Sequence, residues 1–94
     1  MDNVAELKRL VTQILVLISQ PEPQTLKEVL AMLDAIASPE KSESWKLLGD
    51  ALLDEAKKTS TSDADALFLI VVGSSCVGVS IGLKREENRK ASQA

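Results

Sequence analysis

The chain of 94 residues is poor in the side chains that perform most enzyme chemistry. It contains no histidine and no tyrosine, and only one tryptophan, one phenylalanine and one cysteine. Without histidine there is no imidazole base, and neither a cysteine–histidine pair nor a serine triad can form. The single cysteine excludes a disulfide within the chain. We therefore expect a protein that is not an enzyme and that uses no metal or other cofactor.

An excess of positive charge is also missing. The formal net charge is −3, and the one basic cluster, at residues 84–90, is interrupted by Glu86 and Glu87. Proteins that bind nucleic acids need a basic face, and those that bind single strands also use aromatic side chains on which bases stack. The sequence therefore argues against a nucleic-acid partner.

Proline is rare, and its positions divide the first part of the chain. Apolar residues recur at helical spacing in three segments, which are separated by the prolines at 21 and 23 and by the proline at 39. The three segments are residues 3–19, residues 24–37, and a segment that begins between 39 and 44 and ends near residue 58. We therefore predict an N-terminal three-helix unit, the head, over residues 1–60.

Charge is absent from one long stretch, residues 66–83, which read ALFLIVVGSSCVGVSIGL. A helix rising about 1.5 Å per residue would extend over roughly 27 Å here, close to the roughly 30 Å of hydrocarbon in a bilayer. Ser62 and Asp65 fit a capping box directly before the run. We predict a long apolar C-terminal helix over residues 61–90, with a membrane span at 66–83 and a frayed tail at 91–94.

Two other interpretations of the apolar run stay open. It can be the central helix of a soluble bundle, but four helices rarely bury one of their number on every side. The remaining apolar face would then meet another chain and form a dimer. The alternation from Val77 to Leu83 also fits a β-hairpin that turns at residues 73–75, although an isolated hairpin is only marginally stable in water. The fold class that we predict is all-α, a three-helix unit followed by the long apolar helix.

Small residues recur every four positions within the run, at Ser74, Gly78 and Gly82. Such residues lie on one face of a helix and allow a second helix to approach closely, which is how membrane spans pair. We therefore predict that these three residues form a helix-pairing face. Cys76 lies in the same run, where a cysteine usually acts as a small buried hydrophobic residue.

The leading hypothesis is a small, non-enzymatic, single-span membrane protein. Its head would bind a protein partner, and its C-terminal helix would anchor it and pair it with another copy. The predicted partner-binding residues lie on the apolar faces of the head: Leu7, Leu10, Ile14, Leu26, Leu30, Leu33 and Trp45. The register of Trp45 with Leu48 and Leu52 favours a place in the core of the head for this residue. The alternative hypothesis is a soluble, cytoplasmic adaptor, chaperone or regulatory subunit that buries the 66–83 helix in a homodimer or a larger complex.

Overall fold

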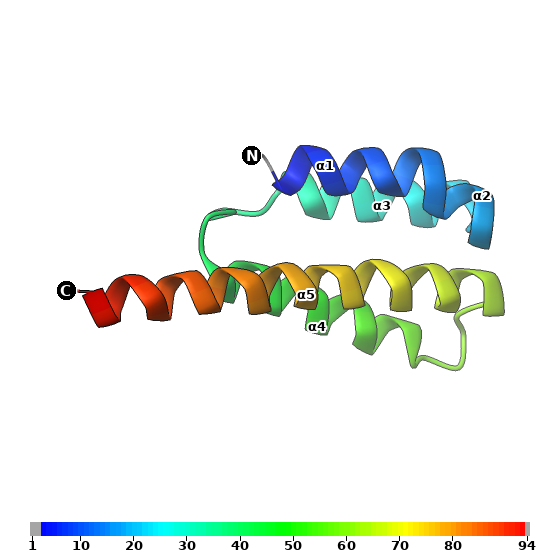
Figure 1. Ribbon diagram of the computed structural model, residues 1–94. Helices are drawn as coiled ribbons and strands as arrows, with labels where there is room; N and C mark the ends of the chain where they lie inside the picture. The colour runs from blue at the N-terminus through cyan, green and yellow to red at the C-terminus, as the bar shows by residue number, and fades with distance from the viewer. Residues whose placement is uncertain (1–2, 94) are drawn as a thin grey trace.

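The computed structural model describes residues 3–93, and the regular structure in this range is entirely helical (Figure 1). The first helix is continuous and consists of α1 (Asn3–Leu10), the π-helical segment η1 (Val11–Leu15) and α2 (Val16–Ser19). It is followed by α3 (Pro23–Asp34), α4 (Ser42–Ala56) and α5 (Asp63–Gln93). The predicted all-α fold, with a long apolar helix at the C-terminal end, is confirmed. Because the whole apolar run is helical, the hairpin interpretation is wrong.

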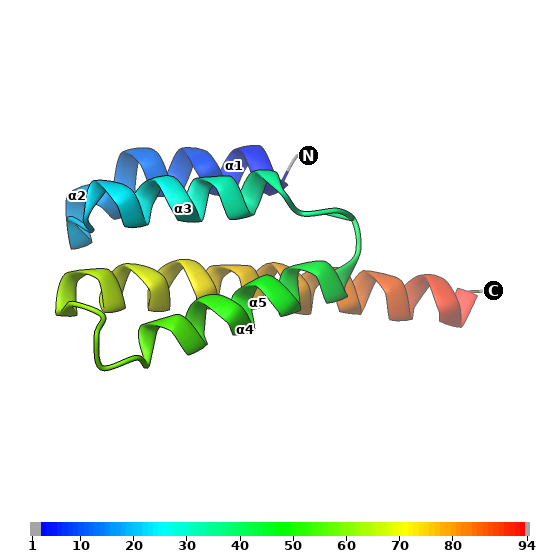
Figure 2. The same ribbon diagram turned by 180° about the vertical axis from the view of Figure 1, so that it is seen from behind.

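The helices pack as two layers (Figures 1 and 2). The first helix lies beside α3 in one layer, and α4 lies beside α5 in the other. The loop after α3 carries the chain from the first layer to the second at one end of the molecule. The last turns of α5 extend beyond both layers, and they include residues 91–93, where a frayed tail is expected from the sequence. Residue 94 lies outside the described residues.

The prolines near residue 20 separate the first helix from α3, as the sequence predicts. Gln20 follows α2 in a left-handed backbone conformation, with φ of 48°, and its N–H donates to the oxygen of Val16 at 2.9 Å. This geometry closes the last turn of the first helix. Pro23 then occupies the first turn of α3, where a missing N–H costs nothing.

The π-helical segment η1 determines which side chains of the first helix reach the core. A regular helix would place Leu7, Val11, Ile14 and Ile18 on one face. In the structure Leu7 and Val11 are buried, but Ile14 is 44% and Ile18 is 68% exposed. A π turn contains an extra residue, which rotates everything after it by about 100°. Ser19 is consequently buried in place of Ile18.

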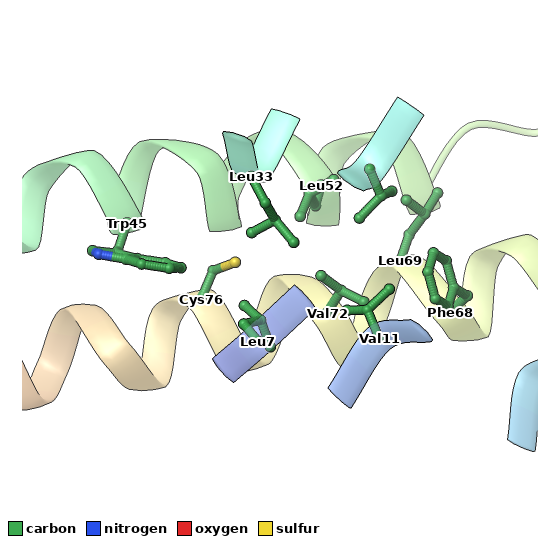
Figure 3. Close-up of a cluster of buried hydrophobic side chains, with 10 residues drawn as sticks. Leu7, Val11, Leu33, Trp45, Leu52, Phe68, Leu69, Val72 and Cys76 are labelled. Carbon is green, nitrogen blue, oxygen red and sulfur yellow. The ribbon is translucent and has the colours of Figure 1, made fainter. Parts of the chain in front are cut away.

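The hydrophobic core lies between the two layers, and all four helices supply it (Figure 3). Its buried residues are Leu7, Val11, Val29, Leu33, Trp45, Leu52, Phe68, Leu69, Val72 and Cys76. The last four of these come from α5. One face of the apolar helix is thus part of the same core as the head helices, and the core crosses the boundary that the sequence suggests between residues 60 and 61.

The two helices of the second layer approach most closely at Gly49 of α4 and Gly73 of α5. A Cβ atom built on Gly49 would lie 2.9 Å from the backbone oxygen of Gly73 and 2.8 Å from Cγ2 of Val77. A Cβ atom on Gly73 would lie 3.2 Å from the backbone oxygen of Gly49. Only glycine fits at the first position without moving the helices apart, so this pair fixes how α4 and α5 pack.

We predict that Gly49→Ala lowers the free energy of unfolding by about 1–3 kcal/mol, because the new methyl group overpacks against a backbone oxygen that cannot rotate away. The measurement is urea unfolding followed by circular dichroism.

The matched control is Gly82→Ala, since no atom lies within 4 Å of a Cβ at that position. Alanine favours a helix over glycine by up to about 1 kcal/mol, so this variant should be as stable as the parent protein or more so. Equal effects of the two substitutions would contradict the close contact at Gly49.

Candidate interaction surface

The first turn of α5 is bound to the start of α3 through the carboxylate of Asp65. Its Oδ1 accepts a hydrogen bond from the backbone N–H of Glu22, and its Oδ2 accepts one from the hydroxyl of Thr25, both at 2.8 Å. The free N–H groups at the start of a helix favour a negative charge nearby. The backbone N–H of Asp65 donates to Oγ of Ser62 at 3.2 Å, which is one half of the predicted capping box. The carboxylate serves α3 rather than the other half of that box.

The C-terminal part of α5 is bound to the start of α4 in the same manner through Glu87. Its two carboxylate oxygens accept hydrogen bonds from Ser42, one from the backbone N–H at 2.8 Å and one from the hydroxyl at 2.9 Å. The backbone hydrogen bond and then the hydroxyl hold the pKa of the Glu87 carboxyl below its ordinary value. Together with Asp65, Glu87 fixes both the position and the rotation of α5.

The face of α5 that points away from the core is apolar and exposed. It is formed by Leu67, Ile70, Ser74, Gly78 and Ile81, which we call the outer stripe. Its three large side chains are between 46% and 50% exposed. Successive residues of an α-helix are turned by about 100°, so the five positions fall within an arc of about 80°. No charged residue lies on any face of α5 between Asp65 and Lys84.

The same helix is long and apolar enough to span a membrane, by length and composition. A third, 33%, of its apolar 18-residue window is buried inside the molecule. A buried core helix of a soluble protein has the same length and composition. The structure therefore places one face of the apolar helix against the core and leaves another face exposed.

Most of the predicted partner-binding residues face the core. Leu7, Leu33 and Trp45 are 5%, 0% and 0% exposed, and the indole N–H of Trp45 donates to the backbone oxygen of Pro39 at 2.7 Å. Three further residues are half-buried and pack against the same core: Leu10, Leu26 and Leu30. Ile14 is exposed, because it follows the start of the π turn. The seven residues therefore do not form one accessible face in this arrangement.

The predicted helix-pairing residues, by contrast, lie together on an accessible face. Ser74, Gly78 and Gly82 are all exposed, and no atom lies within 4 Å of a Cβ built at either glycine. Ser74 and Gly78 form the middle of the outer stripe, and Gly82 lies at its edge. Large apolar side chains flank these small ones at both ends of the stripe, so the surface is narrow at its centre and wide at its ends.

Other chemical groups on the molecule give little basis for a reactive site. Burial raises the pKa of the Cys76 thiol to about 11, so the thiol stays protonated and unreactive near neutral pH. Within residues 3–93 no three histidine, cysteine or acidic side chains are grouped as metal ligands. A hollow of about 460 Å³ lies between α3, α4 and the start of α5, and it is lined by both apolar and polar side chains.

Sequence reasoning did not identify the contacts of Gly49, Gly73 and Glu87. A glycine in the middle of the otherwise strongly helical segment around residue 49 is a signal of close backbone approach, because glycine costs helix stability. Glu87 carries no such signal, since its partner lies 45 positions earlier in the chain. No protein-family model, curated protein or solved structure matches this chain.

We predict that Glu87→Gln lowers the melting temperature at pH 7, because the charged acceptor for the start of α4 is lost. A carboxyl whose pKa is lower in the folded protein stabilises the fold above the pKa of the unfolded chain, and this contribution is lost as the pH falls through the folded pKa. The difference in melting temperature between parent and variant should therefore shrink below about pH 4.3.

The measurement is thermal unfolding by circular dichroism at several pH values. Glu40→Gln is the control, since Glu40 is exposed and makes no hydrogen bond or ion pair within residues 3–93. A difference for Glu87→Gln that does not change between pH 7 and pH 3 would contradict the charge-assisted contact.

Proposed function

We propose that this chain is a small, non-enzymatic helical subunit that acts by docking the outer stripe of α5 on an apolar surface of another protein chain. One observation carries the proposal. A single helix supplies part of the core with one face and exposes an apolar, uncharged face on the opposite side. Soluble proteins seldom leave a long apolar face open to water, and such faces usually mark interaction sites.

The contacts at the two ends of α5 support docking by a preformed surface. Asp65 and Glu87 hold α5 to the starts of α3 and α4, and the glycine pair fixes its rotation against α4. The outer stripe therefore faces away from the bundle without any rearrangement. A rigid surface loses less conformational entropy on binding than a flexible one, which favours affinity. This is the class of a helical adaptor or regulatory subunit.

A single-span membrane anchor is the second candidate, and the length and apolar composition of α5 favour it. In that state every face of residues 66–83 meets lipid, so α4 and the first layer have to leave α5. Helix α4 cannot enter the bilayer together with α5, because its outer side carries the exposed ion pair of Lys46 and Asp50, which is costly to place in hydrocarbon. The released head, residues 1–60, would then bind the partner.

Two substitutions on opposite faces of α5 separate the candidates. Ile70 lies in the outer stripe and is 46% exposed, whereas Val72 is fully buried in the core. We predict that Ile70→Arg leaves the fold and melting temperature near those of the parent and abolishes docking. Val72→Arg should unfold the protein, because an unpaired charge in a core costs several kcal/mol. The measurements are circular dichroism and fractionation of the full-length protein from cells, with carbonate extraction.

The fractionation has a different result for each candidate. A docking subunit is in the carbonate supernatant. Arginine leaves it folded at position 70, on the exposed face, and unfolds it at position 72, in the core. A membrane span is in the carbonate-resistant pellet, and arginine weakens its retention at position 70 and position 72 alike, since both faces meet lipid. Retention of the parent protein in the pellet, together with an equal loss of retention in the two variants, would contradict the proposed function.

A further inference from the structure

We infer that the partner of the outer stripe is a second copy of this chain, with the two α5 helices packed antiparallel about Ser74. The inference rests on the proposed function and adds the identity and direction of the partner. It follows from two features of α5: the order of large and small residues along the stripe, and the opposite charges at its two ends.

The positions of the stripe residues are symmetric about Ser74, and a large residue on one side, Ile70, corresponds to a glycine on the other, Gly78. Leu67 lies seven positions before it and Ile81 seven positions after it, while Ile70 and Gly78 lie four positions to either side. In an antiparallel pair centred on Ser74, Ile70 of each copy packs on Gly78 of the other, and Leu67 packs on Ile81. The two backbones come closest at the small residues in the centre. The large side chains fill the wider space towards the ends, where crossing helices diverge.

The charges at the ends of the stripe are opposite. Asp63 lies at the N-terminal end and Arg85 at the C-terminal end, and both fall within the same arc of α5 as the stripe itself. Both side chains are exposed, and neither makes an ion pair or hydrogen bond within residues 3–93. Each lies eleven positions from Ser74, so the antiparallel pair brings Asp63 of one copy beside Arg85 of the other, at both ends.

The charges at the two ends also disfavour a parallel pair. Two parallel copies in register would place Asp63 beside Asp63 and Arg85 beside Arg85, which is repulsive at each end. Charge complementarity therefore sets the direction of the pair, while the apolar stripe supplies most of the buried surface. Two spans inserted into a bilayer with one orientation would instead run parallel, so the direction of pairing distinguishes this dimer from a paired membrane anchor.

The first test reverses the end charges in the full-length protein and measures the dimer dissociation constant by sedimentation equilibrium. Asp63→Arg and Arg85→Asp should each raise the dissociation constant about tenfold, because each replaces two attractive pairs with two repulsive ones. The double variant restores both attractive pairs with their signs exchanged, and it should return to within about threefold of the parent. Both single effects should shrink at high salt.

The control for these reversals is Lys90→Asp, which makes the same change of charge on an exposed position of α5 outside the stripe. It should leave the dissociation constant unchanged. Single reversals that do not weaken the dimer, or a double variant that stays as weak as the single ones, would overturn the antiparallel arrangement. A parent protein that is soluble and monomeric would overturn the second copy as partner.

The second test reads the direction of pairing from disulfides. Ser74→Cys should cross-link a dimer, since Ser74 faces its own copy. Ile70→Cys alone and Gly78→Cys alone should not, because like positions are displaced by about 12 Å along the axis, but a mixture of these two proteins should cross-link. The parent is the control, because Cys76 is buried. Cross-linking of Ile70→Cys with itself would show a parallel pair.

The two proposals fail in different ways. If the parent protein is found in the carbonate-resistant pellet, the docking function fails and the dimer fails with it. If it is soluble and folded but monomeric, or dimeric with parallel cross-links, only the antiparallel second copy fails. Gly78→Leu adds an independent check: the side chain has free space in a single copy, so the fold should be kept while Ile70 of the partner is displaced and dimers are lost.

Discussion

The close contact between Gly49 and Gly73 is the constraint on which the arrangement of the second layer depends. The apolar run of α5 has no polar face, so its hydrophobic pattern does not determine which side of the helix packs against the core. The glycine contact allows α4 to approach on one side only. The side chains of Phe68 and Val72 are then directed towards the first layer, and the opposite side is left open.

Two carboxylates also hold α5 in place, in addition to the glycine contact. Asp65 binds the start of α3, and Glu87 binds the start of α4. Both are placed just outside the uncharged run, where a polar side chain can reach the other helices without interrupting the apolar surface. The result is a helix held at its middle by shape and near both ends by charge. Because the rotation of α5 is fixed, the residues on its exposed face are fixed as well. The helix therefore presents a preformed surface, which favours docking.

The helical segments and the apolar run were predictable from the sequence, because prolines and the spacing of apolar residues are local signals. The direction in which each apolar face points was not. Ile14 and Ile18 belong to one face in a regular helix, and the π turn over Val11–Leu15 separates them from Leu7. The spacing of Ser74, Gly78 and Gly82 correctly placed them on one face of a helix. Leu33 and Trp45 pack into the core, because the apolar helix itself covers the faces that the sequence leaves open for a partner.

Trp45 is the only tryptophan in the chain, and there is no tyrosine. It is fully buried between the layers, and its indole N–H is bonded to the carbonyl of Pro39 in the loop that joins them. Tryptophan emission from the unlabelled protein therefore comes from this one site. Water that enters between the layers shifts that emission to longer wavelength, so the natural fluorescence of the protein reports directly whether α5 is packed in the bundle or has left it.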